Sequence, residues 1–370
     1  MLRTGLLAIL LLVFGAVVAD ETATDTRPGL APDIREDETV LKTQRGNFVA
    51  VPIPISNPTL DTGLVAGAAY FYPQSDEEAK LQPASLTAAA GMYTSNGSRA
   101  LGIAQQNYWK NDRWRFTGVI AAADLRLSLL TPDDTGEGSS VDWRINGDVL
   151  FSKLSRRLKG NWYGGAFVRA IDANQSINAD IRDDQTEFEI DDATSVGVGL
   201  VAEYDSRDLP LNSYAGQHLK IDALFNDEKL GSNQTYQSYS AAFRSYHRIA
   251  DSVVLAWEVQ GCKRGGTAPL WDACLIKLRG FSATDYLGRV SASGQIEARW
   301  QMGPRWGLVG FAGSGYVSDS FAGVRERESI PSYGGGLRFL VLPAKRVNIR
   351  LDYARSENSD AIHFSVGEAF

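Results

Sequence analysis

An unbroken alternation of apolar and polar residues runs through Arg289-Val290-Ser291-Ala292-Ser293-Gly294-Gln295-Ile296-Glu297-Ala298-Arg299-Trp300-Gln301-Met302. The apolar or small residues of this stretch would share one face, and the polar residues would share the other. A period of two is typical of a β-strand that is apolar on one side. Fourteen residues exceed the usual strand of a soluble domain and suit a tilted strand that crosses a bilayer and projects beyond it.

The same pattern recurs along the chain and predicts sixteen strands. They cover residues 48–56, 62–72, 84–94, 98–109, 113–125, 141–151, 161–171, 194–204, 216–225, 235–247, 252–261, 289–302, 306–317, 332–342, 346–355 and 360–370. An even number of strands is typical of bacterial single-chain outer-membrane barrels. The expected fold class is therefore all-β, a transmembrane antiparallel β-barrel of about sixteen strands. A soluble β-sandwich or β-helix is the alternative, but such folds usually have shorter strands and turn their apolar face inward.

The connections between these strands alternate in length, as an outer-membrane barrel requires. If the first strand runs outward, odd-numbered strands should end in long extracellular loops and even-numbered strands in short periplasmic turns. Long connections are expected at residues 126–140, 172–193, 262–288 and 318–331, and short ones at 110–112, 248–251, 303–305 and 343–345. Connections 73–83 and 205–215 break the pattern in length, and Asn96-Gly97 predicts a short outer hairpin turn.

The N-terminus has the composition of a secretory signal peptide, residues 1–19. Arg3 precedes an apolar run from Gly5 to Val18, and cleavage is expected before Asp20. A membrane-anchoring helix is the alternative, but the apolar run is shorter than the roughly 20 residues that a span needs. Residues 20–45 are acidic, contain proline and lack periodicity, which predicts a flexible N-terminal tail ahead of a barrel at 46–370.

Composition excludes several function classes. The formal net charge of −7 argues against a nucleic-acid partner, because that binding depends on neutralising phosphates with Lys and Arg. No nucleophile motif, phosphate loop or metal-ligand spacing is present, so we expect neither an enzyme nor a cofactor nor a metal site. Gly334-Gly335-Gly336 predicts close packing or a bend, and His218 and His363 predict hydrogen bonds in the lumen.

Cys262 and Cys274 are the only cysteines. In an oxidising compartment, we expect them to form a disulfide that closes a small loop and contributes about 3 kcal/mol. An acidic run at residues 183–192 is expected to be a solvated extracellular loop. The alternative is cation bridging to the phosphates of lipopolysaccharide.

The segment Leu278-Arg279-Gly280-Phe281 resembles a motif of the BamA/TamA-like outer-membrane insertase and bacterial surface-antigen superfamily. In that family, a Val/Ile-Arg-Gly-Phe/Tyr motif lies at the tip of the sixth extracellular loop and folds back into the lumen of a sixteen-stranded barrel. Eleven strands precede this loop and five follow it. The strands expected here have the same arrangement around their motif.

Three further segments carry the resemblance, which covers roughly residues 48–370. Tyr204-Asp205-Ser206-Arg207-Asp208 resembles the family's Tyr-Asp-x-Arg-Asp periplasmic turn. The opening at Val51-Pro52-Ile53-Pro54 resembles that of small members. A final strand that ends in Phe370 resembles the C-terminal signal by which outer-membrane barrels are recognised for insertion.

The resemblance also implies a lumenal partner for Arg279. In the family, the loop arginine pairs with acidic residues on the next two strands, and the first of these positions corresponds to Glu297. The second lies in a Phe-x-Asp-x-Gly pattern, which here has Gly313 in place of the aspartate. The loop is therefore expected to be held more weakly or in a different way.

The resemblance implies a function in the outer membrane of a Gram-negative bacterium. Family insertases carry periplasmic POTRA domains, and residues 20–45 are too few to hold one. We therefore expect an accessory role in the assembly or translocation of proteins or lipids. The alternatives are a passive small-solute pore, lined by Arg289, Glu297, Arg299, Arg350 and Asp352, and a structural surface antigen. Expected partners are outer-membrane lipids, lipopolysaccharide, the insertion machinery during biogenesis and a separate periplasmic protein.

Overall fold

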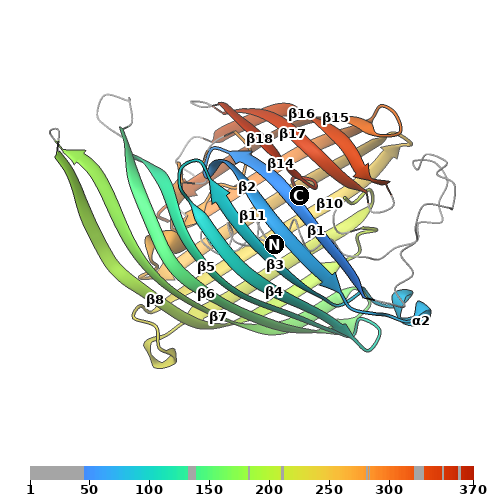
Figure 1. Cartoon of the computed structure of the whole chain (residues 1–370), viewed down its shortest axis with the longest axis horizontal. Helices are drawn as coiled ribbons and strands as arrows, with labels where there is room; N and C mark the ends of the chain where they lie inside the picture. The colour runs from blue at the N-terminus through green and yellow to red at the C-terminus, as the bar shows by residue number, and fades with distance from the viewer. Residues whose placement is uncertain are drawn as a thin grey trace.

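Sixteen antiparallel strands form a closed barrel in the computed structural model (Figure 1). The structure describes residues 46–131, 139–181, 184–209, 212–280, 282, 284–320, 329–343, 346–356 and 360–370. The expected signal peptide and tail lie outside the described residues. Each strand pairs with its neighbours in chain order, and β1 closes the barrel against β18. The fold class predicted from the alternation is confirmed.

The strand bounds agree closely with the sequence pattern along most of the chain. The barrel strands are β1 (Asn47–Asn57), β2 (Asp61–Phe71), β3 (Leu86–Thr94), β4 (Arg99–Trp109), β5 (Trp114–Thr131), β6 (Ser139–Lys159), β7 (Trp162–Ile181), β8 (Asp184–Asp205), β9 (Gly216–Asn226), β10 (Tyr236–Ala250), β11 (Val253–Gly266), β14 (Val290–Gln301), β15 (Trp306–Ser318), β16 (Ile330–Leu342), β17 (Val347–Ser356) and β18 (Asp360–Val366). The short elements are α2 (Asp76–Ala79), η1 (Glu228–Leu230), η2 (Leu270–Asp272), β12 (Cys274–Leu275) and β13 (Leu287–Gly288). None of the described helices is long and apolar enough to cross a membrane.

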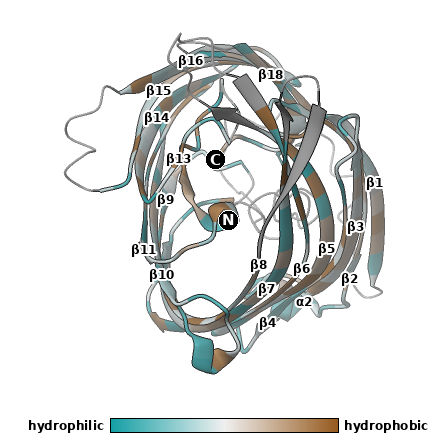
Figure 2. Ribbon diagram, turned by 90° about the vertical axis from the view of Figure 1, so that its left-hand side faces the viewer, coloured by the Kyte–Doolittle hydropathy of each residue, from teal (hydrophilic) through white to brown (hydrophobic). Residues whose placement is uncertain are grey.

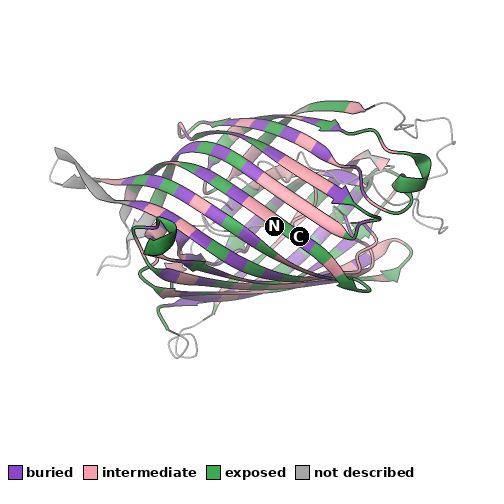
Figure 3. Cartoon of the chain, turned by 90° about the horizontal axis from the view of Figure 1, so that it is seen from below, coloured by how far each residue is buried: buried purple, intermediate pink, exposed green. Residues whose placement is uncertain are grey.

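Side chains on β14 alternate between the outside and the lumen, as predicted. Ile296 and Trp300 are 47% and 50% exposed on the outer surface, whereas Glu297 is 0% exposed inside. The same banding of exposed and buried residues crosses the strands in Figure 3. Because the polar residues of β14 turn inward, this part of the lumen is charged.

The inner wall of β3–β8 is apolar instead. Val119, Ala121 and Ala123 on β5 are buried inside, as are Trp143 and other apolar residues of β6. Polar residues of β6, such as Arg144, point outward. On strands β3–β8, therefore, many apolar residues face the lumen, so an apolar face alone does not identify the outer surface of the barrel.

Two expected loops are largely strands. Residues 126–140 and 172–193 were predicted to be loops, but β5, β6, β7 and β8 extend into them. Within the acidic run, residues 184–192 belong to β8, and residues 184–190 pair with the backbone of β7. Asp183 lies outside the described residues. These four strands are 18 to 22 residues long and project at the end of the barrel opposite α2 (Figure 1). We call this the loop end and the opposite one the turn end.

The backbone pairing between the first and last strands is minimal. Among the described residues, β1 and β18 share the single pair Ser56 with Phe364, whereas β1 and β2 pair from Asn47 with Phe71 to Asn57 with Asp61. Pro52 and Pro54 also remove two backbone donors from β1. We call the β1–β18 contact the seam.

Candidate functional site

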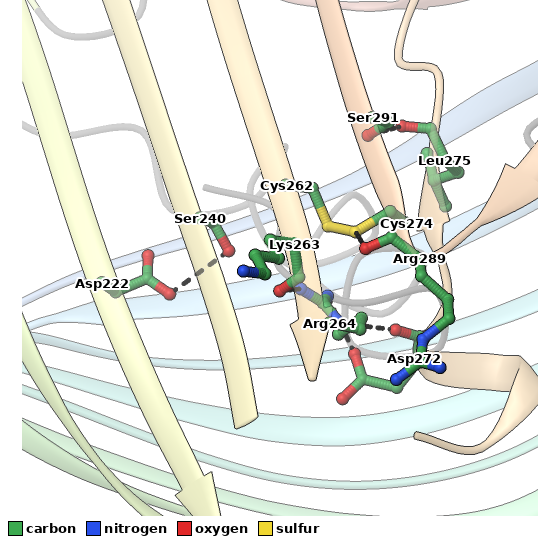
Figure 4. The surroundings of a disulfide bond; sticks show 10 residues. All are labelled: Asp222, Ser240, Cys262, Lys263, Arg264, Asp272, Cys274, Leu275, Arg289 and Ser291. Carbon is green, nitrogen blue, oxygen red and sulfur yellow. Dashed lines mark hydrogen bonds and ion pairs between the residues drawn. A yellow bond between two sulfur atoms is a disulfide. The ribbon is translucent and has the colours of Figure 1, made fainter. Parts of the chain in front are cut away.

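The chain between β11 and β14 folds into the barrel. We call residues 267–289 the lumenal loop, and Figure 2 shows its strand β13 inside the ring of barrel strands. The expected disulfide is confirmed and joins Cys262 to Cys274 (Figure 4). Cys262 lies on β11 rather than in the loop, because that strand extends to Gly266. The disulfide therefore anchors the start of the loop to the barrel wall.

Asp272 fixes the loop near the disulfide. Its carboxylate lies 2.6 Å from Arg169 Nη2 on β7 and 3.0 Å from Arg264 Nη2 on β11. It also accepts a 2.7 Å hydrogen bond from the hydroxyl of Tyr236. Burial by itself would raise the pKa of Asp272, but the charges of Arg169 and Arg264 outweigh it and hold that pKa below its usual range.

Sequence reasoning missed this anchor, because a lone aspartate in a long loop carries no periodic signal. Arg169 and Arg264 belong to no motif either. A weak indication was the neighbouring Trp271, which is 1% exposed and packs with the apolar inner wall. A tryptophan buried in a long loop indicates that the loop docks.

Arg279 contacts carboxylates from two strands. Its Nη2 lies 2.6 Å from Glu297 Oε2, and its Nη1 lies 2.9 Å from Asp352 Oδ2. The guanidinium carbon lies 3.4 Å from the ring centroid of Phe311, a cation–π contact. The first partner is the one implied by the resemblance. The second lies on β17 rather than on β15.

These groups belong to a closed ring of alternating charges. Glu297 contacts Arg299 at 2.7 Å, and Arg338 contacts Asp352 at 2.5 Å. Glu368 completes the ring, at 2.8 Å from Arg338 and 4.0 Å from Arg299. We call Arg279, Glu297, Arg299, Glu368, Arg338 and Asp352 the charge ring. It joins the lumenal loop to β14, β16, β17 and the C-terminal segment.

Glycines make room for this arrangement. A Cβ on Gly313 would lie 2.7 Å from the Gly294 carbonyl oxygen and 3.1 Å from Leu278 Cδ2, so an aspartate does not fit there. A Cβ on Gly334 would lie 2.6 Å from Phe311 Cζ, and one on Gly336 would lie 2.0 Å from Asp352 Oδ1. The close packing predicted for the glycine run is confirmed, and it places Asp352 beside Arg279.

The tip of the lumenal loop contacts both sides of the seam. The backbone N–H of Gly280 donates to His363 Nε2 on β18 at 3.4 Å. The Ser282 hydroxyl donates to Thr59, in the turn that follows β1, at 3.2 Å. Phe281, the last residue of the expected motif, lies outside the described residues. One loop tip therefore connects β18 to the turn that follows β1.

The C-terminal residues leave the last strand and enter the barrel. A final strand through Phe370 was predicted, but β18 ends at Val366 and Gly367 has a φ of 91°, which favours glycine. The Phe370 carbonyl oxygen accepts a 3.1 Å hydrogen bond from Arg299, and its ring centroid lies 6.5 Å from that of Tyr246 on β10. The final strand is shorter than expected because this segment joins the charge ring.

The turn motif of residues 204–208 forms a clamp at the turn end. Asp205 accepts two hydrogen bonds from the guanidinium of Arg207, at 2.9 and 2.8 Å. Asp208 accepts from the backbone N–H groups of Tyr214 and Ala215, and contacts Arg346 at 2.7 Å. The rings of Tyr204 and Trp162 lie 5.2 Å apart. Through the contact between Asp208 and Arg346, the motif joins the turn after β8 to the turn after β16.

One cluster has the ligand types of a metal site. Ligand atoms of Glu203, Asp205 and His218 lie within 4.8 Å of one another. Glu203 already contacts Lys153 at 3.7 Å and His218 at 3.0 Å, and Asp205 is bound by Arg207. Lys153 and Arg207 supply a positive charge to each carboxylate, so the cluster has the arrangement of an ion-pair network.

Of the charged residues expected to line a pore, Arg289 stands apart. It is exposed and donates to the Gly266 carbonyl oxygen at 2.7 Å. Arg350 lies inside and donates to the Ser365 hydroxyl at 2.7 Å. Glu297, Arg299 and Asp352 are all bound into the charge ring.

Comparison with solved structures identifies barrels of the same fold. BamA from Haemophilus ducreyi lacking POTRA domains 1–3 is 11% identical, with a TM-score of 0.58 over 87% of this chain and 69% of that one. CdiB from Acinetobacter baumannii is 13% identical, with a TM-score of 0.58 over 88% and 60%. CdiB from Escherichia coli is 10% identical, with a TM-score of 0.59 over 85% and 62%.

The chain spans less than two thirds of the length of the two CdiB structures. No protein-family model matches it, and no curated protein matches it in sequence. At this level of identity the shared property is the barrel fold. The fold implied by the resemblance to BamA/TamA-like proteins is confirmed.

Proposed function

We propose that this barrel resides in the outer membrane of a Gram-negative bacterium and assists the assembly or translocation of proteins or lipids by opening at its seam. The observation that carries the proposal is the single residue pair, Ser56 with Phe364, between β1 and β18. Unpaired backbone groups on an edge strand form a template for an incoming strand. A seam with few backbone pairs also requires little energy to separate.

The lumenal loop would hold the seam closed. Gly280 and Ser282 contact residues on its two sides. Glu368, two residues beyond β18, belongs to the same charge ring as Arg279. Movement of the loop tip would therefore release the turn after β1, β18 and the C-terminal segment together. The partners we propose are outer-membrane lipids, lipopolysaccharide, the insertion machinery during biogenesis and a periplasmic protein that delivers clients.

A cysteine lock across the seam tests this function. We would replace Ser56 and Phe364 by cysteine, oxidise the pair and reconstitute the mature barrel in liposomes. The probe is a urea-unfolded eight-stranded outer-membrane barrel, whose rate of insertion is followed by heat-modifiable migration. We expect wild-type protein to accelerate insertion and the oxidised S56C/F364C variant to lose that acceleration, which reduction should restore.

The matched control locks two strands that are already fully paired. Ala68 on β2 and Ala89 on β3 are Cα partners, so oxidised A68C/A89C should retain the wild-type acceleration. Equal activity of both locked variants would reject the seam mechanism. A large steady conductance without any acceleration would favour the passive pore, and neither activity would favour a structural surface antigen.

A further inference from the structure

A cavity lies between the lumenal loop and the wall of β9, β10, β11 and β14. Its volume is about 190 Å³, well above the roughly 10–15 Å³ that one water needs. It is lined by six cationic side chains, Lys220, Arg244, Arg264, Lys277, Arg279 and Arg350. Two carboxylates, Asp222 and Glu258, share the lining. The wall is therefore strongly positive.

The surrounding ion pairs offset only part of this charge. The Asp272 carboxylate that binds Arg264 also binds Arg169. The carboxylates bound by Arg279 are likewise shared, Glu297 with Arg299 and Asp352 with Arg338. In the charge ring, Glu297, Glu368 and Asp352 balance Arg279, Arg299 and Arg338, whereas Asp272 alone faces both Arg169 and Arg264. The other cations of the lining, Lys220, Arg244, Arg264, Lys277 and Arg350, still outnumber Asp222 and Glu258, so positive charge remains in excess around the cavity.

Two donors at the cavity have no partner among the described residues. Arg350 donates its Nε–H to the Ser365 hydroxyl, but its Nη1 is buried without a hydrogen bond. The Nε of Arg279 is also buried without one. Both residues line the cavity. A buried guanidinium donor without a hydrogen bond is unfavourable, so an acceptor placed there would stabilise the site.

Lys277, in the lumenal loop, also lines the cavity. Burial, followed by the positive charge of Arg264, lowers the pKa of Lys277 to about 8. The carboxylates Glu258 and Asp222 raise that pKa without restoring its ordinary value, and an anion in the cavity would act in the same direction.

We propose that this cavity binds a small oxyanion of the phosphate type, with Arg350 of β17 and Lys277 of the lumenal loop as contacts. Guanidinium groups bind phosphate oxygens through charge-assisted and often bidentate hydrogen bonds. The phosphate would be either a free ion or the headgroup of a lipid. Because the site joins the loop to the wall, its occupant would also hold the lumenal loop in place.

The test uses the whole mature barrel, folded in an uncharged maltoside detergent without phosphate. One arm titrates inorganic phosphate by calorimetry, and the second titrates dihexanoyl phosphatidic acid below its micellar concentration. We expect one ligand per chain and at least a tenfold weaker affinity in Arg350→Gln. Arg305→Gln is the matched control, because Arg305 is exposed in the turn between β14 and β15.

Binding in the first arm assigns the site to a free oxyanion, and binding in the second arm alone assigns it to a lipid headgroup. If Arg350→Gln does not fold, as judged by heat-modifiable migration, Lys277→Gln replaces it and should show the same loss. Binding in neither arm would overturn the proposal, as would equal affinities for wild type and both folded variants.

Discussion

Arg279 and Asp352 form an ion pair inside the barrel at 2.9 Å, although 73 positions separate them in the chain. This pair replaces the contact that the resemblance led us to expect on β15. Gly313 there has no room for a side chain, and β17 supplies the carboxylate instead. The loop is held in a different way rather than left without a second partner.

The first prediction concerns Glu297, which binds both Arg279 and Arg299. Replacing Glu297 by Gln leaves two buried guanidinium groups short of a counter-charge. Removing one partner from a buried ion pair costs about 3–5 kcal/mol, so the free energy of unfolding should fall by that order. Urea titration followed by heat-modifiable migration measures it. Asp148→Asn, on the exposed face of β6, should leave the midpoint unchanged, and equal midpoints for both variants would contradict a structural role for Glu297.

The second prediction concerns the missing aspartate. Gly313→Asp should destabilise the barrel rather than strengthen the lock, because its Cβ would lie 2.8 Å from Gln295 Cβ. Overpacking of this kind typically costs about 1–3 kcal/mol. Gly313→Ala separates crowding from charge and should account for most of the loss in the same urea titration. A Gly313→Asp variant more stable than wild type would show that the aspartate can still be accommodated.

The barrel was predictable because its signal is local. Alternating residues along sixteen segments indicate the number and order of the strands, and the short turns indicate which strands are neighbours. The extensions of β5–β8 were not predictable from the same rule. Their inner residues, such as Ile145 and Ile171, are apolar and their outer residues are mixed, so the face pattern differs from that of β14.

Residues of the site could be predicted only where they belong to a recognisable motif. Arg279 and Glu297 followed from the resemblance, and the alternation placed Glu297 in the lumen. Asp352 was expected on a polar face, but its pairing with Arg279 depends on three-dimensional packing around the glycine run. The inward path of Glu368 and Phe370 depends on the positive φ of Gly367. No periodic pattern encodes such a turn.

The third prediction concerns acid stability through Asp272. The folded pKa of Asp272 lies below its usual value, so its ion pairs contribute fully above about pH 4, the ordinary aspartate pKa. That contribution is lost as the pH falls through the lower folded value. Asp272→Asn should therefore be less stable than wild type by about 3 kcal/mol at pH 7, and the difference should shrink below about pH 4.

Urea midpoints at a series of pH values check this behaviour, with Asp148→Asn as the control that should match wild type throughout. A difference between wild type and Asp272→Asn that stays constant down to pH 2 would mean that protonation of Asp272 does not release the loop. Limited proteolysis locates the effect, since cleavage should increase between β11 and β14.

The fourth prediction concerns conductance. The charge ring and the disulfide hold the lumenal loop across the barrel, so refolded wild-type protein should conduct weakly in planar bilayers. Replacing residues 268–286 with a short Gly-Ser linker should raise the conductance severalfold, because it removes both Asp272 and Arg279. A control replaces residues 228–232, which include η1 in the loop after β9, and should leave the conductance unchanged. A large wild-type conductance that the linker does not increase would mean that the loop leaves an open path through the barrel. That result would favour a passive small-solute pore.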